Sequence, residues 1–416
     1  MAPGRGGRQG APGKWRLVLV AGGAAAVVVA VGAMAAVAFT GDNGTPEKRT
    51  KPTVAAAPPA WTIEAGRQLT SGTGLRYDGT MTVGGTPVQA HLRVTPSGLA
   101  TGTLTAGLLK ADVIAVGGDT YLKAGPEFWR DHAGEITHLE YYAGHWSKAP
   151  ASMPGFDVPD VLGPESIARM LAEAPAEPPE EKVNGVPAFK VETPKAVYLV
   201  AAAAPHRLLS VRGTGQNAPR FTATPVAAPV ALFKELRPRV AKLGGAADPG
   251  LGFRPGTLTF SNCDKNTTGC TVSVPATLTS PADGVPDGAR AALRASITSR
   301  GEPLGSCTAS DAVPADRALV LRCTVTSKRW RSWMRNALDN PGSYPYEATA
   351  HVVGEAVDAD DIGKLLARVD RERKAVVKRA PSTPGPSTPG PSESGEPSVH
   401  RSGQPEVATS QSPERP

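Results

Sequence analysis

Apolar residues are most concentrated in one unbroken run at residues 17–39, which contains only Ala, Val, Gly, Leu, Met and Phe. As a helix, this run is long enough to cross the hydrocarbon core of a bilayer, which is about 30 Å thick. The arm before it, residues 1–16, carries four cations and no acidic residue. Positively charged flanks stay in the cytoplasm, so the pattern predicts a single-pass cell-membrane anchor with a cytoplasmic N-terminus and an extracytoplasmic bulk.

The same run has a second interpretation as a cleaved secretory signal, because residues 36–38 (Ala-Val-Ala) resemble a small-residue cleavage site. The apolar core of a signal peptide usually spans about 7 to 15 residues. This run is longer, which favours an anchor that is retained. In both interpretations the remaining chain is exported. It stays tethered to the membrane if the run is an anchor and is released if the run is a cleaved signal.

Beyond a Pro-rich spacer at residues 40–60, short apolar segments alternate with Gly, Pro and Asn turns. Residues 88–94 (Val-Gln-Ala-His-Leu-Arg-Val) place an apolar side chain at every second position, which is typical of a strand with one buried face. We expect similar strands at residues 77–83, 100–105, 112–116, 120–123, 189–193, 197–201, 208–213 and 220–223.

One helical pattern interrupts these strands. Pro164 suits the first turn of a helix, and Ile167, Met170 and Leu171 follow at helical spacing. Several strands, one helix and several more strands predict an antiparallel sheet with helices packed on one side. We assign this domain to residues 61–224.

The C-terminal half is expected to contain four further parts. Residues 225–250 read as a linker with a short helix, and residues 251–356 as a small disulfide-bonded β domain resembling a sandwich. Residues 357–379 form a charged helix with one apolar face, and residues 380–416, with nine prolines, a disordered Pro/Ser-rich tail. Within the β domain we expect strands at residues 257–260, 270–274, 291–298, 319–326 and 347–353. Between the last two strands, helical spacing predicts an apolar stripe, which we expect to be core and whose alternative is a membrane-touching surface. The stripe consists of Trp330, Trp333, Met334, Ala337 and Leu338.

The four cysteines all lie in the predicted β domain. Exported chains meet no reducing pool, so these thiols are expected to form disulfides. Cys263 and Cys270 flank a turn-like segment, and Cys307 and Cys323 flank a second, longer segment. This spacing predicts the pairs Cys263–Cys270 and Cys307–Cys323. The Cys-x2-Cys spacing of zinc sites is absent from the sequence.

Composition and charge narrow the classes of function. The chain has 46 Gly, 41 Pro and only 5% aromatic residues, which suits many short strands and turns. The net charge is +7, and four of the positive charges lie in the predicted cytoplasmic arm. The exported part is therefore only mildly basic, and we expect no nucleic-acid partner.

The sequence contains no Gly-x-Ser-x-Gly elbow and no His-Glu-x-x-His zinc motif, so we expect no enzyme and no cofactor. One loop-like stretch gathers possible ligands for a metal, and a metal-assisted hydrolase is a minor alternative. No two of its histidines are four residues apart, as two ligands on one helix face would be, so we expect no metal. The stretch contains Asp131, His132, Glu135, His138, Glu140 and His145.

Two stretches, residues 90–104 and residues 117–129, resemble the LppX/LprG-type lipid-binding lipoproteins of actinobacteria, which are similar in turn to LolA-type lipoprotein carriers. Residues 145–148, the helix near Ile167 and the strand from Val197 fall in a similar order. The resemblance covers about residues 61–223 and implies an α+β fold. In that family a curved antiparallel β half-barrel is covered by helices on its concave face.

The resemblance further implies an apolar cavity between sheet and helices that holds the acyl chains of a lipid or lipoglycan. From the residues alone, an aliphatic side chain that lines a cavity cannot be distinguished from one in a filled core. The candidate lining residues are Val88, Ala90, Leu92, Val94, Leu104, Val113, Ile167, Met170 and Leu171.

The chain departs from this lipoprotein family in its means of attachment, because its first cysteine is Cys263 and no lipobox cysteine exists. An apolar helix in place of a lipid anchor implies a tethered binder rather than a shuttle. Our first hypothesis is a membrane-anchored extracytoplasmic protein that binds a lipid without catalysis. The alternative is a cell-envelope protein with a filled core that binds cell-wall or protein partners.

Overall fold

The computed structural model describes residues 57–83, 85–132, 136, 138–150, 153, 157–214 and 218–379. All the described residues belong to one compact unit. The predicted cytoplasmic arm and membrane anchor lie outside the described residues, as do the tail and nearly all of the spacer. Within the part of the chain that is described, no helix is both long and apolar enough to cross a bilayer.

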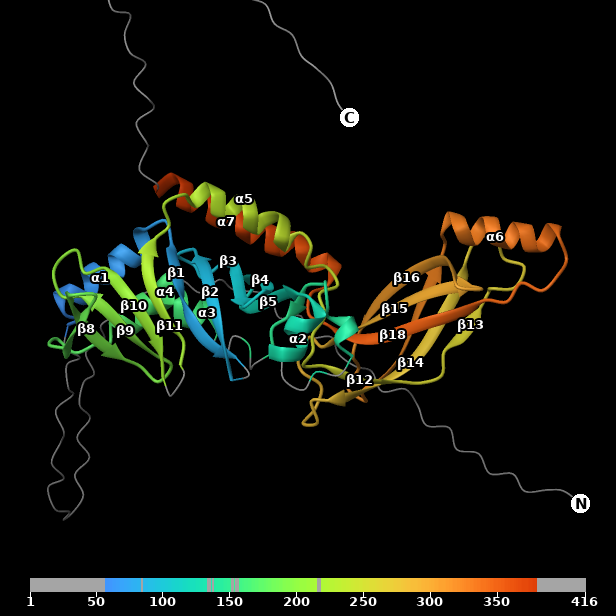
Figure 1. Cartoon of the computed structure of the whole chain (residues 1–416), viewed down its shortest axis with the longest axis horizontal. Helices are drawn as coiled ribbons and strands as arrows, with labels where there is room; N and C mark the ends of the chain where they lie inside the picture. Colours follow the sequence, from blue (N-terminus) through green and yellow to red (C-terminus); the bar gives the residue numbers. More distant parts are fainter. Residues whose placement is uncertain are drawn as a thin grey trace, which may run out of the picture. The chain divides into compact units, whose positions relative to one another are not determined.

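The larger sheet has eleven strands, all paired antiparallel, in the order β6-β5-β4-β3-β2-β1-β11-β10-β9-β8-β7 (Figure 1). The first and last of these strands, β1 and β11, pair at its centre, so one meander extends to each side. The strands are β1 (Leu75–Val83), β2 (Thr86–Val94), β3 (Ala100–Ala106), β4 (Leu109–Val116), β5 (Asp119–Ala124), β6 (Ser147–Lys148), β7 (Glu180–Val183), β8 (Val186–Glu192), β9 (Ala196–Ala201), β10 (Leu208–Gly213) and β11 (Arg220–Pro225).

Four helices and a 3₁₀ turn pack against one face of this sheet and share its main buried cluster. Side chains of Trp61, Ala65 and Leu69 follow each other at intervals of four residues and are buried on one side of α1. Such a stripe explains why a helix forms there. The elements are α1 (Ala60–Ser71), α2 (Pro126–His132), η1 (Leu139–Tyr141), α3 (Val158–Leu162) and α4 (Pro164–Leu171).

The other face of the sheet is covered as well, by α5 (Pro229–Val240) and α7 (Ile362–Arg379), which run side by side (Figure 1). This corrects the expectation of helices on one side only. The cause lies in β4, where Val113 faces the first cluster and Ile114 faces α5 and α7. A strand with consecutive apolar residues is typical of a sheet that is buried on both faces.

The remaining strands form two small antiparallel sheets with a shared buried cluster. Both predicted disulfides, Cys263–Cys270 and Cys307–Cys323, are confirmed, and the second joins the two sheets by linking β16 to β17. The sheet elements are β12 (Gly252–Pro255), β13 (Thr259–Ser261), β14 (Cys270–Ser280) and β17 (Ala318–Val325) in one sheet, and β15 (Arg290–Ser299), β16 (Glu302–Ala312) and β18 (Glu347–Glu355) in the other.

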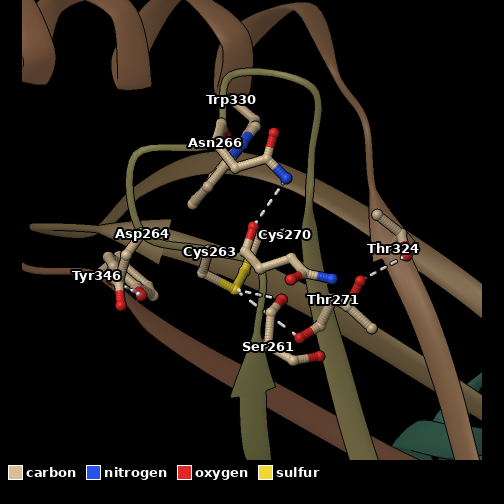
Figure 2. Close-up of a disulfide and its surroundings, with 10 residues drawn as sticks. Ser261, Cys263, Asp264, Asn266, Cys270, Thr271, Thr324, Trp330 and Tyr346 are labelled. Carbon is tan, nitrogen blue, oxygen red and sulfur yellow. Dashed lines mark hydrogen bonds between the residues drawn. A yellow bond between two sulfur atoms is a disulfide. The ribbon is translucent and has the colours of Figure 1, made fainter.

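The helix α6 (Lys328–Asp339) closes one end of this cluster, and η2 (Ala359–Asp361) precedes α7. Ser327 caps α6 by accepting a hydrogen bond from the Trp330 amide at 2.9 Å. The indole of Trp330 is fully buried and donates to the carbonyl of Asn266 at 3.1 Å, beside the Cys263–Cys270 disulfide (Figure 2). Of the expected helical core stripe, Trp330 and Met334 are buried, whereas Leu338 is 44% exposed.

The predicted strands are found in the three sheets, with ends shifted by a few residues. Several further elements were not predicted. These are the helices α1, α2 and α3 and the strands β6, β7, β12 and β16. The predicted linker at residues 225–250 contains α5, a twelve-residue helix with a buried face, and is a packed element of the fold.

Candidate ligand-binding pocket

Eight of the nine expected cavity residues are brought together in a packed core. These eight are at most 1% exposed and belong to the buried cluster between sheet and helices. A side chain without accessible surface borders neither solvent nor a void large enough for water. The interior is therefore packed at these positions, which are Val88, Ala90, Leu92, Val94, Leu104, Val113, Ile167 and Leu171.

Two buried tyrosines help to close this interior by fixing α3 to the sheet. Tyr77 of β1 donates to the carbonyl of Leu162 at 2.7 Å, and Tyr198 of β9 donates to that of Val161 at 3.1 Å. Burial raises the pKa of both phenols, so both stay protonated and able to donate. The ninth candidate, Met170, is half-buried, and its sulfur lies 3.7 Å from the Tyr198 hydroxyl.

An apolar pocket of about 490 Å³ lies elsewhere, between the C-terminal half of α1 and the ends of β1, β10 and β11; we call it the α1 pocket. Its volume falls within the range of about 300 to 1,000 Å³ that is usual for small-molecule sites. Apolar side chains from all four elements line it. These are Leu69, Leu75, Leu208, Leu209, Ala223 and Pro225.

The turn from α1 into β1 sets the shape of this pocket. Thr73 donates through its hydroxyl to the Val226 carbonyl at 2.8 Å, and the Val226 amide donates to the Gly74 carbonyl at 3.0 Å. Gly74 has a φ of +107°, and a Cβ there would lie 2.4 Å from the Val94 carbonyl oxygen. Only glycine allows the chain to enter β1 this close to the end of β2.

Two exposed guanidinium groups belong to the lining of the α1 pocket, those of Arg207 before β10 and Arg379 at the end of α7. Arg379 donates to the Thr70 carbonyl at 2.9 Å, which ties α7 to α1. Neither arginine has an ion-pair partner in the part of the chain that the structure describes. The pocket thus combines aliphatic side chains with unneutralised positive charge.

A second pocket, of about 660 Å³, lies between α4 and the β8–β9 hairpin and includes Met170. Its lining combines apolar residues, such as Ala174 and Val191, with two pairs of opposite charge. Lys195 forms an ion pair with Asp160 and lowers the pKa of that carboxyl, and Lys190 lies 2.6 Å from Glu192. An acyl chain placed there would desolvate these charges, so the second pocket is the poorer site for an apolar ligand.

The expected metal-binding candidates do not converge. His132 is buried, with no hydrogen-bond partner for Nδ1, whereas His138 is exposed and pairs with Glu140 at 3.0 Å. Burial lowers the pKa of His145. Glu135 lies outside the described residues. Among the residues that are described, no group of three or more potential ligands is close enough to hold a metal ion.

Sequence reasoning did not find the α1 pocket, because its lining comes from the ends of four elements. One local signal was present: the spacing of Trp61, Ala65 and Leu69, which marks α1 as a helix with an apolar face. The preceding Pro59 also suits a helix start.

No protein-family model matches the chain, and no curated protein matches it. Among solved structures, the chain is similar to MucB of the Pseudomonas aeruginosa MucA/MucB complex, with 11% sequence identity and a TM-score of 0.22. That likeness covers 65% of this chain and 94% of MucB. A crystal structure of MucB gives 12% identity and a TM-score of 0.22, over 74% of this chain and 95% of that one. TM-scores this low support no transfer of fold or function.

Proposed function

We propose that this chain is an extracytoplasmic, non-catalytic binding protein that holds the apolar chain of a lipid in the α1 pocket. Two disulfides support an oxidising location outside the cytoplasm. Residues 17–39, as an uncleaved membrane anchor, would keep the binding domain at the cell membrane. The resemblance to LppX/LprG-type lipoproteins agrees with this class of ligand.

The observation that carries the proposal is a pocket of about 490 Å³ whose lining combines aliphatic side chains with a few polar ones and with two arginines that have no carboxylate partner among the described residues. Each methylene that moves from water into such a pocket contributes about 0.8 kcal/mol. Guanidinium groups bind carboxylates and phosphates through paired hydrogen bonds. Arg207 and Arg379 therefore favour a ligand with an anionic headgroup, such as a fatty acid or phospholipid.

A fluorescent long-chain fatty acid tests the proposal with residues 41–416, which include the whole compact unit, its three buried clusters and both disulfides. Leu209→Trp fills the α1 pocket from β10. Losing the burial of two methylenes costs about 1.6 kcal/mol, so we expect about tenfold weaker binding. The matched control is Leu108→Trp, because Leu108 is fully exposed at a hairpin turn.

Headgroup recognition requires a second comparison. Arg207→Gln with Arg379→Gln should weaken binding of the fatty acid and leave binding of its uncharged methyl ester unchanged. If Leu209→Trp and Leu108→Trp bind the probe equally well, the α1 pocket is not the site. If no probe binds to the unmodified chain, the lipid proposal itself is wrong.

The alternative is an envelope protein that binds wall or protein partners through its surface. The specific observation in its favour is the packed interior, where the eight expected cavity residues are at most 1% exposed. This function requires no lipid. It predicts that residues 41–416 purified without detergent yield no bound lipid on extraction with organic solvent. It also predicts that they do not bind a fluorescent acyl probe.

A further inference from the structure

A polar pair of side chains on the β domain faces the segment that carries η1. Arg294 of β15 and His351 of β18 lie directly opposite each other in the antiparallel ladder. Their neighbours along the strands, Leu293 and Val352, are buried in the cluster of the β domain. Because successive side chains of a strand point to opposite faces, Arg294 and His351 point away from that cluster.

Both members of the pair contact residues outside the β domain. The Arg294 guanidinium donates to the carbonyls of Tyr141 at 3.2 Å and of Gly245 at 2.9 Å. The His351 Nδ1 lies 3.0 Å from the Tyr141 hydroxyl, and the centres of the two rings are 4.5 Å apart. Tyr141 is thus fixed through both its backbone and its side chain. We call these contacts of Tyr141 and Gly245 with Arg294 and His351 the junction.

Positive charge at the junction has no close compensation. Neither Arg294 nor His351 lies within ion-pair distance of a carboxylate in the part of the chain that the structure describes. Glu140, the acidic residue whose charge acts on His351, is exposed and pairs with His138 at 3.0 Å. A second positive charge at this place would therefore meet no free carboxylate.

The other elements around the pair supply no free carboxylate either. The strand β14 carries no charged residue, and β12, which lies beside β18, carries a single cation. The remaining charged and titratable groups are Glu355, which pairs with Arg290 at 3.2 Å, Asp248, which lies 3.9 Å from Lys148, the buried phenol of Tyr142, and the exposed side chains of Arg254 and His145.

A proton on His351 places a second positive charge directly opposite Arg294. Like charges at opposite positions of paired strands destabilise the pairing. The Glu140 carboxylate and the Tyr141 ring favour the protonated imidazole, whereas partial burial and the charges of His138 and Arg294 oppose it. The Tyr141 hydroxyl can donate to a neutral Nδ1 or accept from a protonated one, so the effect comes from the added charge and not from loss of this hydrogen bond.

We propose that the junction is a pH-sensitive contact, which is closed while His351 is neutral and loosens when His351 is protonated. Burial, with His138 and Arg294, holds the pKa of His351 below its ordinary value of about 6.5, against the opposing charge of Glu140. In the loosened state the imidazole regains its ordinary pKa, so that state binds more protons. The junction is therefore most stable above about pH 6.5 and loses stability as the pH falls below this value.

Hydrogen exchange tests this proposal on the full chain in phosphatidylcholine nanodiscs. The amides of Lys148, Gly245 and Ala247 are hydrogen-bonded beside the junction and are followed by mass spectrometry, with β2 and β3 as internal reference. Rates are corrected for the intrinsic pH dependence of exchange. Between pH 7.5 and pH 5.5 the protection of these amides should fall several-fold relative to the reference. One pH unit below the ordinary pKa, the upper limit of this loss is about tenfold.

Two substitutions of His351 separate its charge from its shape. His351→Gln is neutral at both pH values and should stay protected at both, whereas His351→Lys is charged at both and should be weakly protected at both. The matched control is His91→Gln, which removes an exposed histidine of β2 and should keep the pH dependence of the unmodified chain.

Four results would overturn the proposal. The first is equal protection of the unmodified chain at the two pH values. The second is a loss in His351→Gln as large as in the unmodified chain, and the third is a His351→Lys junction as protected at pH 7.5 as the unmodified one. The fourth is a His351→Gln junction that is already unprotected at pH 7.5, which would assign the contact to the imidazole ring itself and not to its charge.

Discussion

At the scale of single residues, the protein depends on polar groups that are buried but hydrogen-bonded. Tyr77 has no exposed surface, and its hydroxyl satisfies the carbonyl of Leu162, the last residue of α3. A carbonyl at a helix end has no partner within the helix. Removing the hydroxyl would leave this acceptor buried and unsatisfied, which costs more than the net value of one hydrogen bond.

We therefore expect Tyr77→Phe to lower the free energy of unfolding by about 1 to 3 kcal/mol, measured by urea denaturation. Tyr344→Phe is the matched control, because the Tyr344 hydroxyl forms only a long, exposed hydrogen bond of 3.4 Å with Asn336. The control should change stability by less than about 0.5 kcal/mol. Equal effects of the two substitutions would contradict the role assigned to Tyr77.

At the scale of elements, charged groups hold α5 against the sheet. Glu235 of α5 pairs with Arg93 of β2 and with Arg239 at 3.0 Å, and accepts a hydrogen bond from Thr101 of β3 at 3.1 Å. Partial burial acts to raise the pKa of Glu235. The hydrogen bond from Arg93 and the charges of both arginines outweigh it, and the pKa lies below its usual value.

A lowered folded-state pKa means that the ionised carboxylate stabilises the fold above its unfolded pKa of about 4.3. This contribution is lost as the pH falls through the folded-state pKa. Because Glu235 is partly exposed, we expect Glu235→Gln to cost only about 1 kcal/mol at pH 7. The difference from the unmodified protein should shrink as the pH falls below the unfolded pKa and vanish once Glu235 is also protonated in the folded state. A difference that is independent of pH would contradict the ion-pair explanation.

Element patterns also show what the sequence could and could not predict. Strands such as β2 alternate apolar and polar residues and were predicted, as were both disulfides from the cysteine spacing. The strand β16 was missed because its residues are small or polar and mostly exposed on both faces. Periodicity identified an apolar face on the C-terminal helix but could not reveal its partner, since the partner α5 lies more than a hundred residues earlier.

At the scale of the whole molecule, the chain returns to its first sheet after completing the β domain. Val369 and Val376 of α7 are fully buried in the cluster with Leu232, Phe233 and Leu236 of α5. Arg237 also pairs with Asp370 at 3.1 Å. The C-terminal helix is therefore part of the larger sheet's packing, and the two ends of the described chain stabilise the same structure.

Truncation tests this arrangement. Ending the chain after residue 361 removes two buried valines and exposes the face of α5, so the free energy of unfolding should fall by at least about 3 kcal/mol. Ending it after residue 379 removes only the Pro-rich tail and should leave stability unchanged. If both truncated chains unfold at the same urea concentration as the full chain, α7 does not contribute to the core.

Because α7 packs on the larger sheet, its last residue, Arg379, lies at the α1 pocket, the proposed lipid-binding site. The filled interior could not be foreseen, because packed and cavity-lining aliphatic residues have the same pattern. The α1 pocket could not be foreseen either, because α1, β1, β10 and β11 meet there only in the folded protein. Its proposed occupant is the apolar chain of a lipid.

Photo-crosslinking tests that claim most directly. A long-chain fatty acid that carries a diazirine on its tail is bound to residues 41–416 and irradiated, and the modified peptides are identified by mass spectrometry. The α1 pocket predicts adducts within residues 68–75, 207–209 and 223–225 or at Arg379, which excess unlabelled fatty acid should suppress. Adducts confined to other segments, or adducts that competitor does not suppress, would contradict lipid binding in this pocket.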